Sequence, residues 1–547
     1  AAFVGSMVLD PKGNMAPGFD RGFEHFDAGY RQKRGKQESR YDTIERRAMD
    51  VVTRAIGWLG KNSTRPFFMW IHLYDPHAPY EPPAPYDKKY ADRYDGEVAY
   101  MDAAVGKLVR FLRLRGLYQG ALIATMSDHG ESLGDHGEQM HGIFLYDETI
   151  HVPLLFKLPG MALAGRRVPQ RVRLLDFAPT LLHMLSLPPA PTFQGESLVA
   201  LMRPGARGVT QEQLADRDAY AETDYPHRAF GWSALRSLRS GKYLYIRAPA
   251  PELYDLTRDE KAARDLAESS PAVATTLGLQ LDELRRQTVS VENPSATQEL
   301  SQEQQETLTA LGYIATASGV RSKNPLEGPN PKAKIELSNV LHDAMMAVED
   351  GRWAESVPLF RRVLADSPTI SVAQMQLGTA LARLRHPAEA VGPLRKAVEL
   401  LPDSGPAHYE LGLALYETGA LEESVPHFEF VARKNPKWAD AQYSLASVYA
   451  RTRRVPEAVD LLRTALDSNP QHFRANLLLG RILTLQNLAG EGVSYLEVAV
   501  KAQASSSEAH TFLADAYQRL GRTDDERRER ELAQKAKSAE KPDDPSR

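Results

Sequence analysis

The second half of the chain repeats itself every 34 residues, and this period constrains the fold more than any other feature of the sequence. Proline recurs at that spacing, at Pro368, Pro402, Pro436 and Pro470. In the same register a leucine is followed each time by Gly or Ala; the leucines are Leu377, Leu411, Leu445, Leu479 and Leu513. A period of this length indicates supersecondary units that bury their apolar faces only by stacking on their neighbours.

Within each repeat, the apolar spacing predicts two amphipathic helices. The small residue after the leucine lets the helices approach closely, and the proline ends the second helix. This pattern resembles the tetratricopeptide repeat (TPR) family. The resemblance implies an all-α superhelix of about six repeats over residues 333–537, which binds a protein or peptide partner on its concave face. The polar residues 538–547 are expected to form a disordered tail.

The first half alternates between short apolar runs and amphipathic stretches. Runs of strand length cover residues 66–73, 121–126 and 152–159. Helical periodicity covers residues 44–62, 97–116 and 176–187. This alternation predicts an α/β domain with a mostly parallel sheet of buried strands. Ligands of such sheets bind beyond the carboxyl ends of the strands, so a site is expected in the loops that follow the first two runs.

Ionisable residues gather in those two loops. Asp75 and His77 follow the first run in a proline-rich turn. The second run is followed by a glycine-rich loop with seven ionisable residues, which are Asp128, His129, Glu131, Asp135, His136, Glu138 and His141. Glycines permit tight turns that aim several polar side chains at one point. Because carboxylates and imidazoles are natural ligands of divalent cations, this loop is a candidate metal site.

Three stretches carry a specific resemblance. FFMWIHLYDPHAPYEPP, SDHGESLGDHGE and HGIFLYDETIHVPLLF, in this order, resemble the sulfatase family of the alkaline phosphatase superfamily. FGWSALRSLRSGKYLYIRAPAPELYDL is similar to the segment that closes the family's C-terminal subdomain. The resemblance implies an alkaline-phosphatase-like α/β core over residues 1–215, a small α+β subdomain over 216–287, and a helix and linker over 288–332 that lead into the repeats.

The resemblance also implies roles for four residues. Asp128 and His129 match the family's metal-ligand motif for one divalent cation; calcium is favoured, with manganese, magnesium or zinc as alternatives. His77 and His141 match positions that contact the ester group or its leaving oxygen. A histidine there protonates the leaving alkoxide or stabilises the anionic transition state. The plainer interpretations are a structural His77 in its turn, and His136 rather than His141 in the site.

The family's nucleophile is a Cys or Ser in a C/S-x-P-x-R motif, and the chain contains no cysteine and no fitting motif. We therefore expect the nucleophile and two further acidic ligands to lie upstream of Ala1, so that this piece is inactive while its full-length parent hydrolyses sulfate esters. Two alternatives remain: a phosphoesterase or phosphonate hydrolase of the same superfamily, and a non-catalytic TPR scaffold with a degenerate enzyme domain.

Charge and hydropathy limit the classes of partner that the chain is expected to bind. A net charge of −4 gives no indication of nucleic-acid binding. No apolar run approaches the roughly 20 residues that span a bilayer. The family resemblance suggests a periplasmic or other extracytoplasmic location.

Overall fold

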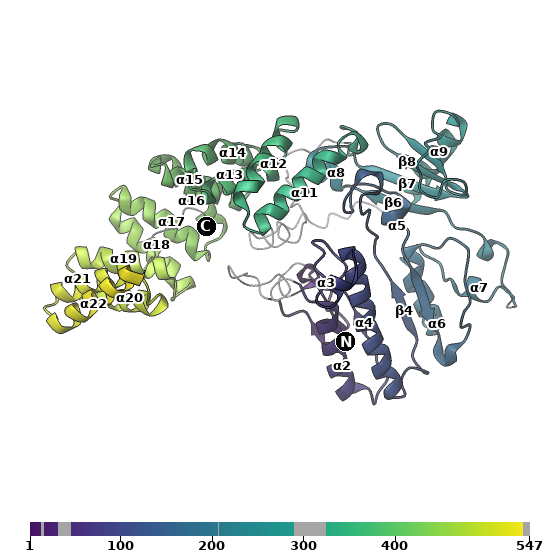
Figure 1. The fold of residues 1–547 in the computed structure, drawn as a ribbon, viewed down its shortest axis with the longest axis horizontal. Coiled ribbons are helices and arrows are strands. Elements are labelled where there is room, and N and C mark those ends of the chain that lie inside the picture. The colour runs from purple at the N-terminus through teal and green to yellow at the C-terminus, as the bar shows by residue number, and fades with distance from the viewer. Residues whose placement is uncertain (12–15, 31–44, 206, 289–323, 540–547) are drawn as a thin grey trace. The chain divides into compact units, whose positions relative to one another are not determined.

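The computed structural model describes residues 1–11, 16–30, 45–205, 207–288 and 324–539 (Figure 1). The chain divides into two compact units, Ala1–Glu349 and Asp350–Arg547. The first is an α/β unit and the second is entirely helical where it is described, so the predicted fold class is confirmed. Almost all of the predicted tail, 538–547, lies outside the described residues.

The strands in the described part of the first unit form three groups. β1 (Ala2–Phe3) pairs in parallel with β2 (Phe26–Asp27) and β3 (Trp70–Ile71). β4 (Ile123–Met126) pairs antiparallel with β5 (Leu154–Lys157). A four-stranded antiparallel sheet follows in chain order, built from β6 (Ala219–Thr223), β7 (Leu235–Ser240), β8 (Tyr243–Arg247) and β9 (Glu252–Asp255).

Within the described ranges, the longer helices of this unit are α2 (Ala48–Asn62), α4 (Arg93–Leu114), α9 (Pro271–Thr288) and α11 (Ile335–Glu349). The short helices are α3 (Tyr86–Lys89), α5 (Asp147–Ile150), α6 (Phe177–Met184), α7 (Val199–Met202) and α8 (Tyr225–Phe230). Single 3-10 turns are η1 (Met7–Leu9), η2 (Asp135–Gly137), η3 (Pro159–Met161), η4 (Leu174–Asp176), η5 (Glu212–Leu214) and η6 (Pro331–Ala333).

Helix α2 links the parallel strands to the rest of the core. Val51 and Ala55 on one side of α2 pack against Phe3 of β1. Val52, one residue on, packs against Ala104 of α4. The apolar spacing of α2 therefore supplies two contact surfaces, which fix the strand ends from which the candidate loops begin.

Two details differ from the sequence-based expectation. The strand at 152–159 was expected to be parallel, but β5 runs antiparallel to β4. The connection between them is a long loop whose only α-helix is the four-residue α5, so it lacks the long crossover helix usual between parallel strands. The apolar runs are also less buried than predicted: Phe68 is 64% exposed and Leu155 is 59% exposed.

The small α+β subdomain predicted for the end of this part is present. Helix α9 packs Leu277 and Leu281 against Leu238 of β7 and Leu253 of β9. This apolar contact holds the antiparallel sheet on one face, which is the usual arrangement in α+β units.

The second unit is a series of antiparallel helix pairs (Figure 1). Its helices are α12 (Trp353–Asp366), α13 (Ser371–Arg383), α14 (Pro387–Leu400), α15 (Gly405–Glu417), α16 (Leu421–Lys434), α17 (Ala439–Arg451), α18 (Val455–Ser468), α19 (Phe473–Leu485), α20 (Ala489–Ala502), α21 (Ser507–Arg519) and α22 (Thr523–Ala539). The period predicted from the sequence is confirmed, because α12, α14, α16 and α18 each end two residues before a repeat proline.

The small residues lie where the helices of a pair approach most closely. A Cβ added to Gly412 of α15 would come within 2.8 Å of Phe428 in α16. The same addition at Gly480 of α19 would come within 2.6 Å of Leu496 in α20. The repeat therefore pairs a small residue with a large apolar one, as the sequence pattern predicts.

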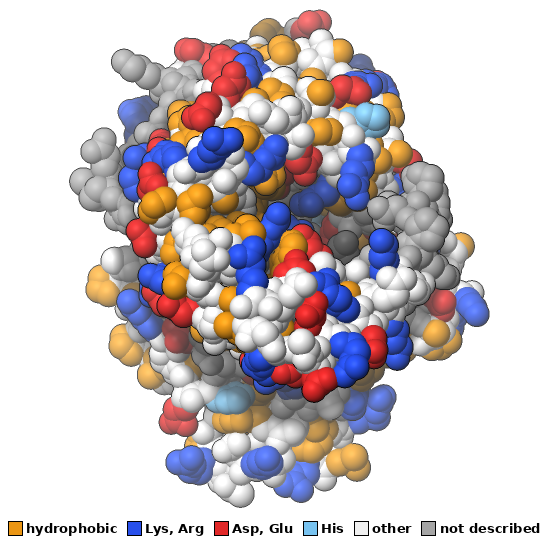
Figure 2. All heavy atoms as spheres, turned by 90° about the vertical axis from the view of Figure 1, so that its left-hand side faces the viewer, with side chains coloured by type: hydrophobic (Ala, Val, Ile, Leu, Met, Phe, Trp, Pro, Cys, Tyr) orange, Lys and Arg blue, Asp and Glu red, His pale blue; other side chains and the backbone are white. Residues whose placement is uncertain are grey.

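The face shown in Figure 2 carries no single dominant charge. Figure 2 shows acidic and basic side chains interspersed over the face that it presents. Within α22 alone, neighbouring pairs such as Arg527–Asp524 and Arg530–Glu526 neutralise each other. Among the described residues, none of the helices combines the length and apolar character that a membrane crossing requires.

Candidate functional site

His77 is held in one orientation by contacts on every side. Its Nδ1 lies 2.7 Å from the carbonyl oxygen of Ala78, and a carbonyl only accepts, so Nδ1 carries the proton. Its Nε2 lies 3.1 Å from the Tyr74 hydroxyl, and the two rings stack with centroids 4.3 Å apart. In the neutral ring, Nε2 is therefore the nitrogen that accepts from the Tyr74 hydroxyl.

The backbone beside His77 is fixed by a buried carboxylate. Glu97 of α4 accepts from the His77 N–H at 3.1 Å and from the Glu81 N–H at 2.8 Å. Burial raises the pKa of Glu97 to about 7, although the two N–H donors partly oppose the shift. At the other end of the turn, Oδ2 of Asp75 accepts a 2.7 Å hydrogen bond from the N–H of Ala48, the first residue of α2. Asp75 is thus explained as a structural residue.

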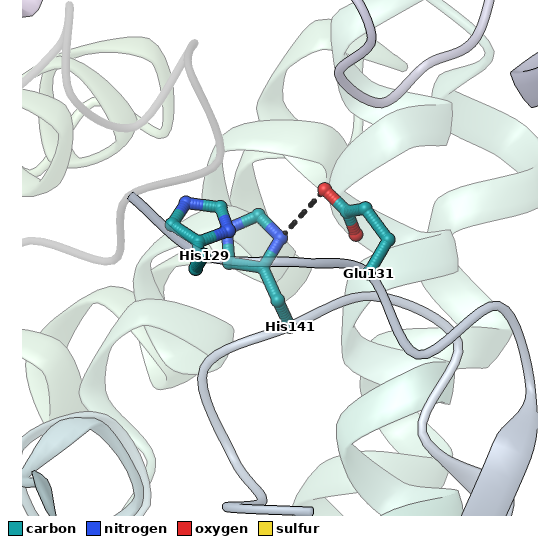
Figure 3. Close-up of side chains that lie close together, drawn as sticks. All are labelled: His129, Glu131 and His141. Atoms are coloured by element: carbon teal, nitrogen blue, oxygen red, sulfur yellow. Dashed lines mark hydrogen bonds and ion pairs between the residues drawn. The ribbon is translucent and has the colours of Figure 1, made fainter. Parts of the chain in front are cut away.

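His141 is paired with a carboxylate from its own loop. Its Nδ1 lies 2.9 Å from Oε1 of Glu131, and the two side chains point toward each other (Figure 3). Burial lowers the pKa of His141, but the Glu131 hydrogen bond and charge outweigh burial and raise it overall. A carboxylate in this position orients the imidazole and stabilises its protonated form.

The predicted histidines meet in space. The His141 ring centroid lies 5.8 Å from that of His77 and 4.1 Å from that of His129. The loops after β3 and β4, about fifty residues apart in the chain, thus bring three imidazoles together, although β3 and β4 lie in separate sheets. His136 bonds instead to Glu148 at 2.5 Å, which satisfies its ring elsewhere in the loop.

A group of three side chains has the geometry to hold a cation. The ligand atoms of His129, Glu131 and His141 all lie within 4.8 Å of one another. Oε2 of Glu131 is buried, and among the described residues it has no hydrogen-bond partner. A buried carboxylate oxygen is costly without a partner, and a cation would satisfy it. Two imidazoles with one carboxylate suit zinc or manganese better than calcium.

Asp128 lies at the exposed edge of this group. Its side chain is 79% exposed, Oδ1 accepts from the His129 N–H at 3.0 Å, and Oδ2 lies 3.8 Å from Nε2 of His129. The ligand role of Asp128 stays a prediction, whereas Glu131, one of the seven ionisable residues of the loop, lies against His141. The signal that points to Glu131 is its position two residues after His129 in a glycine-rich loop.

Other residues near the candidate site are not marked by any sequence motif. Glu97 lies within a regular helix, and its only sequence signal is a carboxylate on the inward face of an amphipathic helix. Burial lowers the pKa of His72, and its Nδ1 accepts from the Gly5 N–H at 3.3 Å. His72 thus has the structural place that its position inside an apolar run suggests.

Three family models match the chain. The sulfatase model matches residues 2–187, and the model for the C-terminal part of N-sulphoglucosamine sulphohydrolase matches residues 134–287. A tetratricopeptide repeat model matches residues 344–405, 375–437, 409–466 and 443–507.

Individual proteins match the chain at low sequence identity. Mouse (Mus musculus) arylsulfatase K is 28% identical over 193 residues, 34% of this chain and 34% of that protein. The ulvan-active sulfatase of Formosa agariphila is 28% identical over 174 residues, 32% of this chain and 26% of that protein. The chain thus spans about a third of the first of these curated relatives and about a quarter of the second. Among solved structures, the phosphonate monoester hydrolase of Agrobacterium radiobacter is 22% identical with a TM-score of 0.39, covering 51% of this chain and 69% of that one.

Proposed function

Because the chain joins a sulfatase-family region, residues 2–287, to tetratricopeptide repeats, we propose that its parent protein is a metal-dependent hydrolase of sulfate esters. The observation that carries the proposal is the convergence of His77, His129 and His141 beside the buried Glu131. Imidazoles at one point suit an anionic ester, because they supply both positive charge and transferable protons.

The contacts of His141 and His77 indicate a different role for each in the proposed reaction. His141, held by Glu131, is the cationic contact to the ester oxygens, since the carboxylate favours its protonated form. The His77 ring lies 5.8 Å from that of His141, and His77 would exchange a proton with the leaving oxygen through Nε2, which bonds to the Tyr74 hydroxyl in this structure. One divalent cation would supply charge stabilisation of the ester. The family resemblance favours calcium on Asp128 and His129, whereas a cation held by His129, Glu131 and His141 would be zinc or manganese and would replace the proton on His141.

The family's nucleophile motif is absent from the 547 residues. We therefore propose that turnover needs residues outside this sequence and that the chain by itself is inactive. The repeats would bind a protein or peptide partner, and the full protein would act outside the cytoplasm, as the family resemblance suggests.

The test uses the protein encoded by the full gene with 4-nitrophenyl sulfate, 4-nitrophenyl phosphate and a phenylphosphonate monoester. We expect the sulfate ester to have the highest kcat/KM, and chelation to abolish turnover until a divalent cation is restored. A preference for either phosphorus ester would reassign the site to a phosphoesterase or phosphonate hydrolase. Absence of turnover in the metal-loaded protein would leave a non-catalytic scaffold.

A matched pair of variants tests the residue roles. Glu131→Ala removes the carboxylate that orients His141, and we expect kcat to fall by about tenfold to a hundredfold. Glu148→Ala removes the carboxylate partner of His136 in the same loop and is the control. Equal losses in both variants would show that the loop responds to any lost His–Glu pair, and would refute a specific role for Glu131.

A further inference from the structure

The segment that leads into the repeats is bound tightly to the sulfatase-family region. This docking segment, residues 324–349, ends with α11. Its carbonyl oxygens at Pro325 and Pro329 accept from the N–H groups of Ala234 and Ser233 at 2.8 and 3.0 Å. At Gly328 (φ +128°), an added Cβ would come within 2.8 Å of a backbone oxygen, so the close approach requires glycine.

A charged contact adds to this attachment. Lys332 donates to Oε2 of the buried Glu252 at 2.7 Å and to the Tyr254 hydroxyl at 3.0 Å. Glu252 also accepts from the Tyr146 hydroxyl at 2.6 Å, so the lysine is part of a buried polar network. Such an ion pair is lost only at high cost, because its partner would be left as an uncompensated buried charge.

Helix α11 then reaches the loop that carries the candidate site. The Asn339 amide donates from Nδ2 to the Gly137 carbonyl at 2.7 Å, and its Oδ1 accepts from the Gln139 N–H at 3.3 Å. One turn earlier, Ile335 lies against Gly137, where an added Cβ would be 3.4 Å from its Cγ2. Two reciprocal hydrogen bonds and an apolar contact thus seat α11 on the segment between Glu131 and His141.

His342 lies on the same face of α11, three residues after Asn339 and seven after Ile335. It is partly buried, and its pKa is lowered by burial and modulated by Asp343, His141 and Glu131. No hydrogen bond joins its ring to another side chain or backbone group among the described residues. The imidazole therefore stands beside the candidate site with its donor and acceptor uncommitted.

We propose that His342 is a substrate-binding residue of this site, contributed by the helix that begins the repeat region, and that it contacts a hydroxyl of the alcohol portion beside the ester. The inference rests on the proposed function and adds a specificity determinant to it. A ring with one donor and one acceptor matches a hydroxyl, which also has both. His77 and His141 remain the contacts to the ester group itself.

The test compares a substrate that has hydroxyls with one that lacks them, in the protein encoded by the full gene. The substrates are glucose 6-sulfate and 4-nitrophenyl sulfate, and the variants are His342→Phe, His342→Gln and the neighbouring exposed Asp343→Asn. We expect His342→Phe to raise KM for glucose 6-sulfate by about tenfold, the effect of one lost hydrogen bond, and to leave 4-nitrophenyl sulfate unchanged. His342→Gln, which keeps a donor and an acceptor, restores part of the loss, and Asp343→Asn has no effect.

Three results would overturn the inference. Equal losses on both substrates with His342→Phe would indicate a structural role, and unchanged kinetics on both would indicate none. Turnover of 4-nitrophenyl sulfate without binding of glucose 6-sulfate by the wild-type protein would also exclude a hydroxyl contact. In these cases the proposed function stands, whereas it fails together with the inference if the wild-type protein hydrolyses and binds neither ester.

Discussion

At the scale of single residues, the position of His77 depends on a carboxylate that is distant in sequence. Glu97 accepts from two backbone N–H groups of the turn that holds His77, and it is almost completely buried. Its burial disfavours the ionised form, while the two N–H donors favour it. Glu97 therefore links the geometry of the candidate site to pH.

We predict that Glu97→Gln flattens the dependence of stability on pH between about 4.5 and 7. Because the pKa is raised to about 7 in the folded state, the folded protein binds more protons than the unfolded chain in this interval. The wild-type contribution is thus full below the unfolded pKa and is lost as pH rises through 7, by up to about 3 kcal/mol. The measurement is the free energy of unfolding in urea from pH 4.5 to 7.5.

The control for this experiment is Glu81→Gln, which changes an exposed carboxylate in the same turn. Its pH dependence should follow that of the wild type. If Glu97→Gln and the wild type instead lose stability in parallel as pH rises, Glu97 is ionised throughout and the turn is held by a permanent carboxylate.

Residue-level reasoning from the sequence depended on local motifs. This reasoning selected His77, His129 and His141, whose rings lie close together, and their catalytic and metal-binding roles stay predictions. It did not find Glu97 or His342, because each lies on a regular helix and approaches the site only through tertiary packing. Their roles depend on long-range contacts that no single stretch of sequence encodes.

At the scale of elements, the repeats were the most predictable part. Three repeats share the same contact between a glycine and a large apolar residue, at Gly378, Gly412 and Gly480, so several copies of the pattern confirm one another. Strand orientation in the first unit was less predictable, because an apolar run specifies burial but not its pairing partner. The antiparallel β4–β5 pair and the exposed Phe68 are the consequences.

We predict that Gly412→Ala destabilises the repeat region by about 1–3 kcal/mol, the usual cost of overpacking. The new Cβ would come within 2.8 Å of Phe428, a rigid aromatic ring in the paired helix. Gly392→Ala in α14 is the matched control, because an added Cβ there meets nothing within 4 Å. Alanine is the better helix former, so Gly392→Ala should be neutral or stabilising by up to about 1 kcal/mol.

Thermal unfolding followed by helical circular dichroism distinguishes the two variants. The expected order of midpoints is Gly412→Ala below wild type, and Gly392→Ala at or above it. If the two substitutions shift the midpoint equally, the close approach of α15 and α16 does not limit the residue at this position.

At the scale of the whole molecule, two ways of dividing the chain give different boundaries. The repeat phase predicts that the array starts near residue 333, and the proposed five-part division stays a prediction. The contacts group α11 with the first unit, which ends at Glu349. The sequence pattern shows which segments belong to the repeat, whereas contacts show which segments stabilise each other. Helix α11 is thus a repeat helix by its sequence and part of the first unit by its contacts.

This difference predicts the behaviour of truncated chains. A chain that ends after Glu349 keeps the hydrogen bonds of Asn339 to Gly137 and Gln139, and a chain that ends after residue 332 loses them. We expect the shorter chain to be less stable by about 1–3 kcal/mol, since two hydrogen bonds and the Ile335 contact disappear. The loop 130–142 should also be cleaved faster in limited proteolysis, because local opening of that loop becomes easier.

The control is Asn339→Ala in the longer chain, which removes the two hydrogen bonds and keeps the rest of α11. It should give a smaller loss of stability and of loop protection. Equal stability and equal loop protection in the two truncated chains would show that α11 contributes nothing to the first unit and that the boundary lies where the repeat phase places it.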